Sequence, residues 1–166
     1  MLALGELREA FLVRAELESL ATEIATPKMS AADLEQLEEA EKRFHDITLE
    51  LVEMAHAGRQ DLEVAREWLH RNHAFHDVIY AAAAVPLIER MAKAARRTFL
   101  VKPVWATGAD LDELYRKNDL QHRAIREAIS ARSPQGARVL AREHVLSSGR
   151  LLEAILDKVA AQTREP

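Results

Sequence analysis

The chain has 166 residues, a formal net charge of −4 and no cysteine. This length fits one domain with a sizeable core, and the absence of cysteine excludes disulfide frameworks, thiolate metal sites and cysteine nucleophiles. There is no overall basic footprint for nucleic acid, no apolar run of the roughly 18 residues that span a bilayer and no secretory pattern at the N-terminus, so we expect a cytoplasmic protein.

The composition predicts helices, since only five glycines and five prolines occur in 166 residues that are otherwise rich in helix formers. The first helix is expected over Leu4 to Thr26, because Pro27 ends it. Its two apolar stripes indicate burial against two neighbours. Ser30 and Asp33 resemble a capping box, which opens a second helix to about Ala57. That helix is charged over most of its length, so we place it at the outside.

Two further helices follow in the middle of the chain. Asp61 can cap a third helix that ends near Ala84. Pro86 suits the first turn of a fourth helix, which we expect to run to about Val101 and to stop before Pro103.

The last two helices complete the prediction. Asp110 and Glu113 resemble a capping box at the start of the fifth helix, and Ser133-Pro134 is typical of the cap and first turn of the sixth. No segment shows the alternation of apolar and polar residues that is typical of a strand. The sequence also contains no internal repeat and no linker that would divide it. The sequence therefore predicts an all-α fold, a single antiparallel bundle of about six helices over residues 1–166.

Two histidines are placed evenly about the break at Ser133. His122 precedes Ser133 by 11 residues and His144 follows it by 11, and about three helical turns span that number. In an antiparallel hairpin these side chains should meet. Asn72 and His76 interrupt the apolar seam of the third helix four residues apart. If that helix packs across the hairpin, all four side chains converge in a central cavity.

A set of three imidazoles and one amide oxygen suits a divalent ion such as Zn, Ni, Fe or Mn, with coordination positions left for water or a carboxylate. A single histidine on an apolar face is more often a satisfied core residue, but the mutual spacing of Asn72, His76, His122 and His144 favours a metal site. The remaining histidines are weaker candidates: His45 and His56 should be solvated, and His70 and His73 lie off the seam.

Arg14 and Glu18 lie four residues apart inside the apolar arc of the first helix. One interpretation is an intrahelical ion pair on a partly buried face. The other is that the Arg14 guanidinium binds an anionic effector bidentately. Arg96, followed by Arg97, is a weaker candidate of the same kind.

Enzyme motifs are mostly absent. The chain has no glycine-rich phosphate loop, no Gly-x-Ser-x-Gly and no His-Glu-x-x-His. One enzyme class remains as an alternative, because His45-Asp46 and His76-Asp77 are dipeptides of the kind that helical metal-dependent phosphohydrolases of the HD type use. Against it, Asp77 should point away from the stripe that carries His76.

Four ordered motifs resemble the FCD domain, the C-terminal effector-binding half of many GntR-type bacterial transcriptional regulators. Arg14-Ala-Glu-Leu17-Glu18 is similar to the Arg-x-x-Leu-Glu of its first helix, and Asn72-His-Ala-Phe75-His76 to its central Asp-x-x-Phe-His. The run Ala81 to Leu87, which includes Pro86, is similar to its small-residue stretch. His122-Arg-Ala-Ile125 and His144 match its two later histidines.

The resemblance implies a helical bundle that holds a divalent metal and a small organic acid, with Asn72, His76, His122 and His144 as metal ligands. Two positions depart from the family pattern: Asn72 replaces the usual aspartate, and Val85 replaces an asparagine.

The resemblance also implies a regulator rather than an enzyme. Such regulators place a winged helix-turn-helix domain before this one, and this chain begins at the first helix of the effector-binding domain. We therefore expect DNA binding only through an N-terminal domain outside this chain, no membrane contact, and a homodimer.

Overall fold

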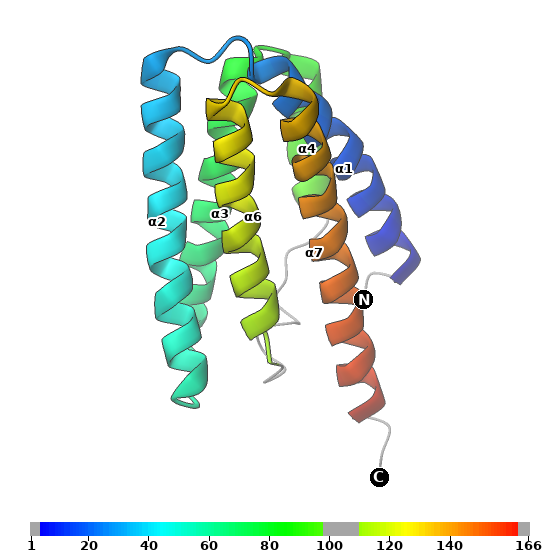
Figure 1. Ribbon diagram of the computed structural model, residues 1–166. Helices are drawn as coiled ribbons and strands as arrows, with labels where there is room; N and C mark the ends of the chain where they lie inside the picture. Colours follow the sequence, from blue (N-terminus) through cyan, green and yellow to red (C-terminus); the bar gives the residue numbers. More distant parts are fainter. Residues whose placement is uncertain (1–3, 98–109, 163–166) are drawn as a thin grey trace.

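The computed structural model describes residues 4–97 and 110–162, and within these ranges it contains six helices and no strand (Figure 1). The helices are α1 (Leu4–Ala25), α2 (Ala31–His56), α3 (Leu62–Ala83), α4 (Pro86–Arg97), α6 (Asp112–Ser130) and α7 (Pro134–Gln162). The predicted all-α bundle of six helices is confirmed. None of the described helices is both long enough and apolar enough to cross a membrane.

Helix starts follow the local capping chemistry in α2 and α3. Ser30 and Asp33 form both halves of a capping box. Asp61 Oδ1 accepts hydrogen bonds from the backbone N–H groups of Glu63 at 2.8 Å and Val64 at 3.3 Å. These contacts satisfy N–H groups that the first turn of a helix leaves unpaired, so both predicted starts are confirmed.

The start of α6 differs from the prediction. The N-cap residue is Leu111, which has no side-chain cap bond, and Asp110 only accepts a 3.0 Å bond from Asp112 N. The predicted capping box with Glu113 is therefore wrong. Leu111 is 5% exposed and packs in a core cluster with Leu114 and Tyr115, so tertiary burial sets this helix start. The predicted end of the fourth helix, near Val101, lies outside the described residues.

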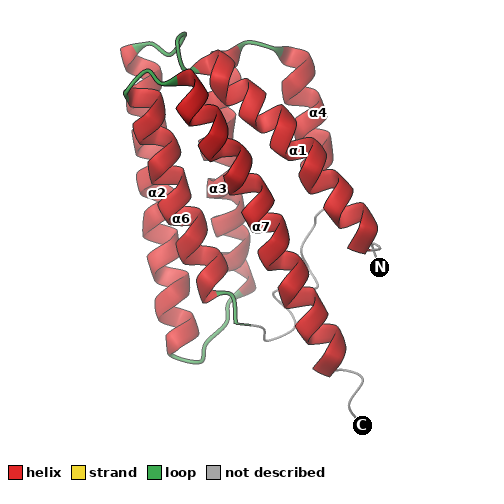
Figure 2. Cartoon of the chain, turned by 45° about the vertical axis from the view of Figure 1, so that its right-hand side comes forward, coloured by secondary structure: helices red, strands yellow, loops and turns green. Residues whose placement is uncertain are grey.

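The helices pack so that α1 and α7 make the most extensive contact in the bundle, and the two lie side by side in both views (Figure 2). Gly149 allows this approach, because a Cβ atom there would lie 2.7 Å from Phe11 Cγ. Arg142 Nε donates to Glu16 at 2.7 Å across the same interface. Helix α2 lies at the edge of the bundle (Figure 1), against α3 and α6.

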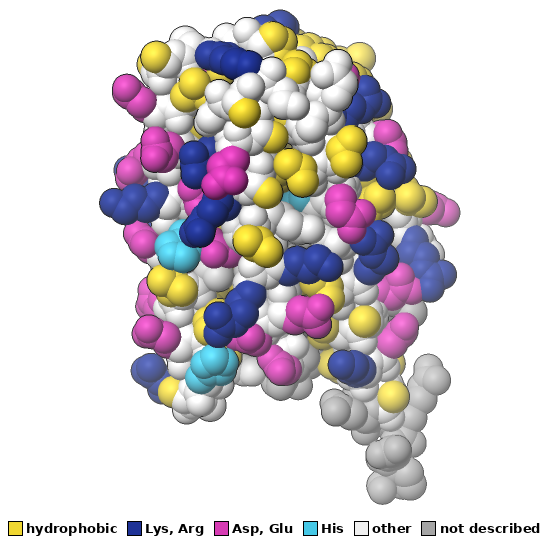
Figure 3. All heavy atoms as spheres, in the orientation of Figure 1, with side chains coloured by type: hydrophobic (Ala, Val, Ile, Leu, Met, Phe, Trp, Pro, Cys, Tyr) yellow, Lys and Arg dark blue, Asp and Glu magenta, His cyan; other side chains and the backbone are white. Residues whose placement is uncertain are grey.

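Charged side chains cover the surface of the bundle, and apolar side chains fill most of its interior. Acidic and basic side chains are interspersed over the face shown in Figure 3, without a single-sign patch on that face. Inside, one apolar cluster centres on Phe75, Ile79 and Ile125, and a second centres on Phe44 and Trp68. Polar side chains from α1, α3, α6 and α7 are also buried, and they form the site described next.

A candidate metal centre beside a central pocket

Three histidines from three helices meet in the interior. His76 comes from α3, His122 from α6 and His144 from α7, and each is at most 4% exposed. Their Nε2 atoms are 3.3 Å apart for His76 and His122, 3.2 Å for His122 and His144, and 3.3 Å for His76 and His144. Three ligands of a tetrahedral zinc ion, each at about 2.0 to 2.1 Å, lie about 3.3 Å from one another. The donor set therefore fits a metal ion.

Neighbouring side chains direct two of these Nε2 lone pairs inward. Glu18 Oε2 lies 3.2 Å from His76 Nδ1, and its negative charge favours the proton on that nitrogen. Gln121 Oε1 lies 3.1 Å from His144 Nδ1, and as an acceptor it favours the tautomer in which Nδ1 carries the proton. The third ring, His122, is held by stacking on Phe75, with ring centroids 4.2 Å apart.

All three imidazoles are neutral at physiological pH, as metal ligation requires. Burial, followed by the neighbouring histidines, holds the pKa values of His76 and His122 well below the ordinary value. Burial also lowers the pKa of His144 to about 4, although Glu18 acts in the opposite direction. Lone pairs for a metal are therefore available without deprotonation near neutral pH.

Glu18 links the histidines to two arginines. Its Oε1 accepts a 2.9 Å hydrogen bond from Arg14 Nε and lies 3.9 Å from Arg96 Nε. Burial opposes the ionisation of Glu18, but the charges of Arg14 and Arg96 outweigh it and lower the pKa of this carboxyl group. The predicted ion pair of Arg14 with Glu18 is present. The same carboxylate also serves Arg96 and His76.

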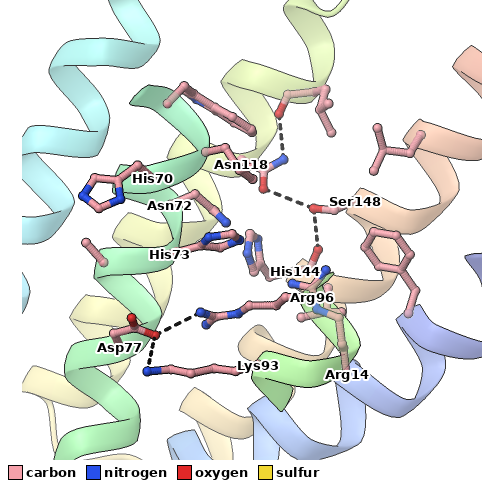
Figure 4. Close-up of a pocket in the computed structure, with 17 residues that line it drawn as sticks. Arg14, His70, Asn72, His73, Asp77, Lys93, Arg96, Asn118, His144 and Ser148 are labelled. Carbon is pink, nitrogen blue, oxygen red and sulfur yellow. Dashed lines mark hydrogen bonds and ion pairs between the residues drawn. The ribbon is translucent and has the colours of Figure 1, made fainter. Parts of the chain in front are cut away.

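A pocket of about 400 Å³ opens beside the three histidines (Figure 4). We call this cavity the central pocket. Its polar and charged lining residues are Arg14, His70, Asn72, His73, Asp77, Lys93, Arg96, Asn118, His144 and Ser148. The apolar walls are Phe11, Trp68, Leu69, Ala74, Leu114, Val145 and Leu152. Both predicted effector-binding residues, Arg14 and Arg96, thus line one cavity together with His144.

Asn72 lies in the same wall. It is 8% exposed, and its Oδ1 atom has no hydrogen-bond partner. A buried amide oxygen without a partner is uncommon in proteins, so this atom is free to accept a hydrogen bond from a ligand or to contact a metal.

Polar atoms without hydrogen bonds gather around this site. Eight buried side-chain nitrogen and oxygen atoms in the described residues lack a hydrogen bond, and six of them belong to Glu18, Asn72, Tyr80, Arg96 and His122. Such atoms cost folding free energy unless a ligand, ion or water satisfies them. Their concentration in one place is typical of a binding site.

Sequence reasoning missed two features of the site. The contact of Glu18 with His76 joins helices far apart in the chain, and no local pattern predicts it. His73, which we judged a weak candidate for a metal ligand, lines the central pocket together with Asp77 and Lys93. Burial, then Arg96 and Arg14, lower the pKa of His73 to about 4.

The remaining histidines do not extend the metal centre. His45 Nδ1 lies 2.9 Å from Asp119 Oδ2, and His56 lies 3.5 Å from Asp112 with a mostly exposed side chain. Asp77 pairs with Arg96 and Lys93 instead of approaching the three histidines. Within the part of the chain that the structure describes, the two His-Asp dipeptides therefore do not converge on one ion.

Comparison with known proteins agrees with the motifs. No curated protein matches the chain. A family model described as the FCD domain matches residues 9–147, a range that includes Arg14, Glu18, Asn72 and all three histidines. Because this match covers far more than half of the chain, the chain belongs to the FCD family, the C-terminal effector-binding domain of GntR-family transcriptional regulators.

Proposed function

We propose that this domain senses a small organic acid together with a divalent metal ion, and that it performs no chemistry on either. The acid and the metal bind side by side between α1, α3, α6 and α7. In the full regulator, which acts in the cytoplasm, their binding alters how an N-terminal DNA-binding domain engages its operator.

The observation that carries the proposal is the convergence of three Nε2 atoms at 3.2 to 3.3 Å. Three neutral imidazoles this close cannot all satisfy one another by hydrogen bonds, since the Nε2 lone pairs of His76 and His144 both face inward and His122 Nε2 can donate to only one of them. A divalent ion (Zn, Ni, Fe or Mn) accepts all three. His76, His122 and His144 would hold it, with the Oδ1 atom of Asn72 as a further donor.

Charge supports an acidic effector. The proposed ligands are all neutral, so they leave the full charge of a bound ion uncompensated. Arg14 and Arg96 line the adjacent pocket, and although Glu18 and Asp77 balance their formal charge, Arg96 keeps Nε and Nη2 without hydrogen bonds. When bound, a metal ion attracts an anion to its open coordination positions. A carboxylate in the central pocket would meet both the ion and the arginines.

Titration calorimetry with zinc and acetate tests this function. Wild-type protein is expected to bind one zinc ion and to bind acetate more tightly with zinc than without it. Arg14→Ala should weaken acetate binding at least a few-fold and leave the zinc stoichiometry unchanged. Arg8→Ala is the matched control, because Arg8 lies on α1 with an exposed side chain paired to Glu153. Absence of zinc binding by folded wild-type protein would refute the proposal.

The transmission of this signal calls for a homodimer, because the operators of such regulators are two-fold symmetric. We place the contact on helical faces away from the central pocket. Light scattering should give twice the monomer mass at high micromolar concentration, and a monomer under those conditions would contradict the dimer.

The alternative function is a metal-dependent phosphohydrolase, and release of phosphate from nucleotides by the metal-loaded protein would favour it over a sensor.

A further inference from the structure

The central pocket is built for an acid of a particular shape. We propose that its effector is a monocarboxylic acid with an apolar tail, of the aryl or branched-alkyl class. The tail lies against Trp68, Leu69 and Leu114. This inference rests on the proposed function for the position of the carboxylate and adds the chemistry of the rest of the molecule.

The pocket has a charged end and an apolar end, and α3 runs between them. Leu69, His73 and Asp77 are spaced four residues apart on this helix, and all three line the cavity. Asp77 pairs with Arg96 and Lys93 at the charged end (Figure 4). Residues four apart lie on one helix face about 6 Å along the axis. Leu69 is therefore two turns away from the charges.

On α6 and α7, too, the residues that line the pocket change from polar to apolar along the helix axis. Asn118 and Ser148 line the pocket one turn beyond His122 and His144, and Leu114 and Leu152 line it one turn further. Figure 4 shows Asn118 and Ser148 on the side of the cavity opposite Lys93 and Asp77. The three helices thus place leucines at one end of the pocket, whereas the cations at the other end come from Arg14 of α1 and from Lys93 and Arg96 of α4.

The polar groups near the apolar end already have partners within the protein. Asn118 Nδ2 donates to Leu114 O at 2.8 Å, and Ser148 Oγ donates to Asn118 Oδ1 at 3.2 Å and to His144 O at 2.9 Å. Trp68 Nε1 donates to Thr48 Oγ1 at 3.0 Å, so its indole N–H is occupied. His70, the remaining polar wall residue at this end, is exposed at the rim.

The groups that need a partner lie at the opposite end. Arg96 is 8% exposed and keeps Nε and Nη2 without hydrogen bonds. Asn72 Oδ1 is also unpartnered, but it lies between the two ends, one turn from His76, where the proposed metal ion would take it as a ligand. A sugar acid or a dicarboxylate would require unsatisfied polar partners along its whole length, because a buried polar group without one is costly. An apolar tail leaves the Asn118 and Ser148 bonds intact and needs no such partner. A volume of about 400 Å³ has room for it.

Calorimetry with four acids, each measured with and without one equivalent of zinc, tests the inference. Phenylacetate is expected to bind at least about 10-fold more tightly than acetate, the gain from burying an aromatic ring. Succinate and gluconate should bind no more tightly than acetate. Equal affinities for acetate and phenylacetate, or a preference for succinate or gluconate, would overturn the tail but leave the proposed function standing. If none of the four acids bound, the proposed function itself would fail.

A matched pair of variants locates the tail. Leu69→Asn should lower the affinity for phenylacetate far more than that for acetate. Leu62→Asn, on the same helix but 52% exposed and outside the central pocket, should change neither. A phenylacetate affinity that is unaltered in folded Leu69→Asn protein would contradict the assignment.

A fluorescence measurement gives a test that does not depend on the folding of the Leu69 variant. The chain has two tryptophans, Trp68 and Trp105, so Trp105→Phe leaves Trp68 as the only indole emitter. Phenylacetate should shift or quench this emission at saturation, and acetate should not. Identical responses to the two acids would overturn the inference.

Discussion

Glu18 is the residue that the arginines and the histidines of the site have in common. It is 2% exposed, and its carboxylate contacts Arg14, Arg96 and His76. A buried carboxylate that fixes the orientation and proton position of a ligating histidine raises the affinity for the metal. Glu18 is therefore a positioning residue, because it acts on the metal through His76.

Replacing Glu18 by Gln keeps its size and removes its charge. Zinc affinity should fall by about 10- to 100-fold, as measured by competition with a chromogenic chelator. Glu16→Gln is the control, since Glu16 lies on the same helix and forms an exposed ion pair with Arg142. Equal zinc affinities of the two variants would show that Glu18 does not orient His76.

Asn72 supplies a second prediction at this scale. Asn72→Asp would add a negative charge beside the ion, so zinc should bind about 10-fold more tightly. Acetate should then increase zinc affinity less than it does in wild type, because the ion already has an anionic partner. Titrations of zinc with and without acetate measure both quantities.

Asn118→Asp is the control for the Asn72 variant, because it adds the same charge to the wall of the pocket at an amide whose oxygen and nitrogen already have partners in Ser148 and Leu114. If both variants change zinc affinity equally, the effect is long-range charge rather than ligation. Equal zinc affinity of wild type and Asn72→Asp would remove Asn72 from the site.

Single-residue roles were predictable where local spacing decided them. His122 and His144 meet because they are equidistant from one turn, a relation that the sequence contains. The contact between Glu18 and His76 depends on how α1 crosses α3, which follows from packing in three dimensions. For the same reason, His73 was recognised as lying off the metal seam but not as a wall of the pocket.

At the scale of elements, the α1–α7 contact depends on a missing side chain. Gly149→Ala would place a Cβ atom 2.7 Å from Phe11 Cγ, and Phe11 is 5% exposed with little room to move. We expect a loss of about 1 to 3 kcal/mol in the free energy of unfolding, measured by urea denaturation. Gly5→Ala on α1 meets nothing within 4 Å and should be neutral or stabilising. A neutral Gly149→Ala variant would mean that the helices can separate at no cost.

Helix boundaries were predictable to the extent that they depend on nearby residues. The caps at Ser30 and Asp61 act within four residues, so the sequence alone locates the starts of α2 and α3. The start of α6 was misplaced because Leu111 is held by contacts with the second core cluster. Where a distant contact competes with a local cap, the local rule fails.

At the scale of the whole molecule, buried neutral histidines make stability depend on pH. In the unfolded chain a histidine takes up a proton near pH 6.5. In the folded protein, burial lowers the pKa values of His73 and His144 to about 4 and those of His76 and His122 well below the ordinary value. As the pH falls below 6.5, the unfolded state therefore binds protons that the folded state does not bind.

The metal-free protein should consequently lose several kcal/mol of unfolding free energy between pH 7 and pH 5. Urea denaturation at pH 7, 6 and 5, followed by circular dichroism, measures this loss. The slope of the unfolding free energy against pH is proportional to the number of protons taken up on unfolding. His73→Gln should reduce that number by about one. A stability that is constant over this range would show that these histidines are not buried in the neutral form.

The pairing of α1 with α7 also bears on how the protein is made. Helix α1 leaves the ribosome more than 100 residues before α7, yet its main contact is with α7. Contacts so distant in sequence form late, because closing the intervening loop costs conformational entropy. During translation, the face of α1 that packs against α7 therefore stays exposed until α7 has been synthesised. Because His144 belongs to α7, the group formed by Arg14, Glu18 and the three histidines is complete only after nearly the whole domain has been synthesised, and a truncated chain would contain no finished site.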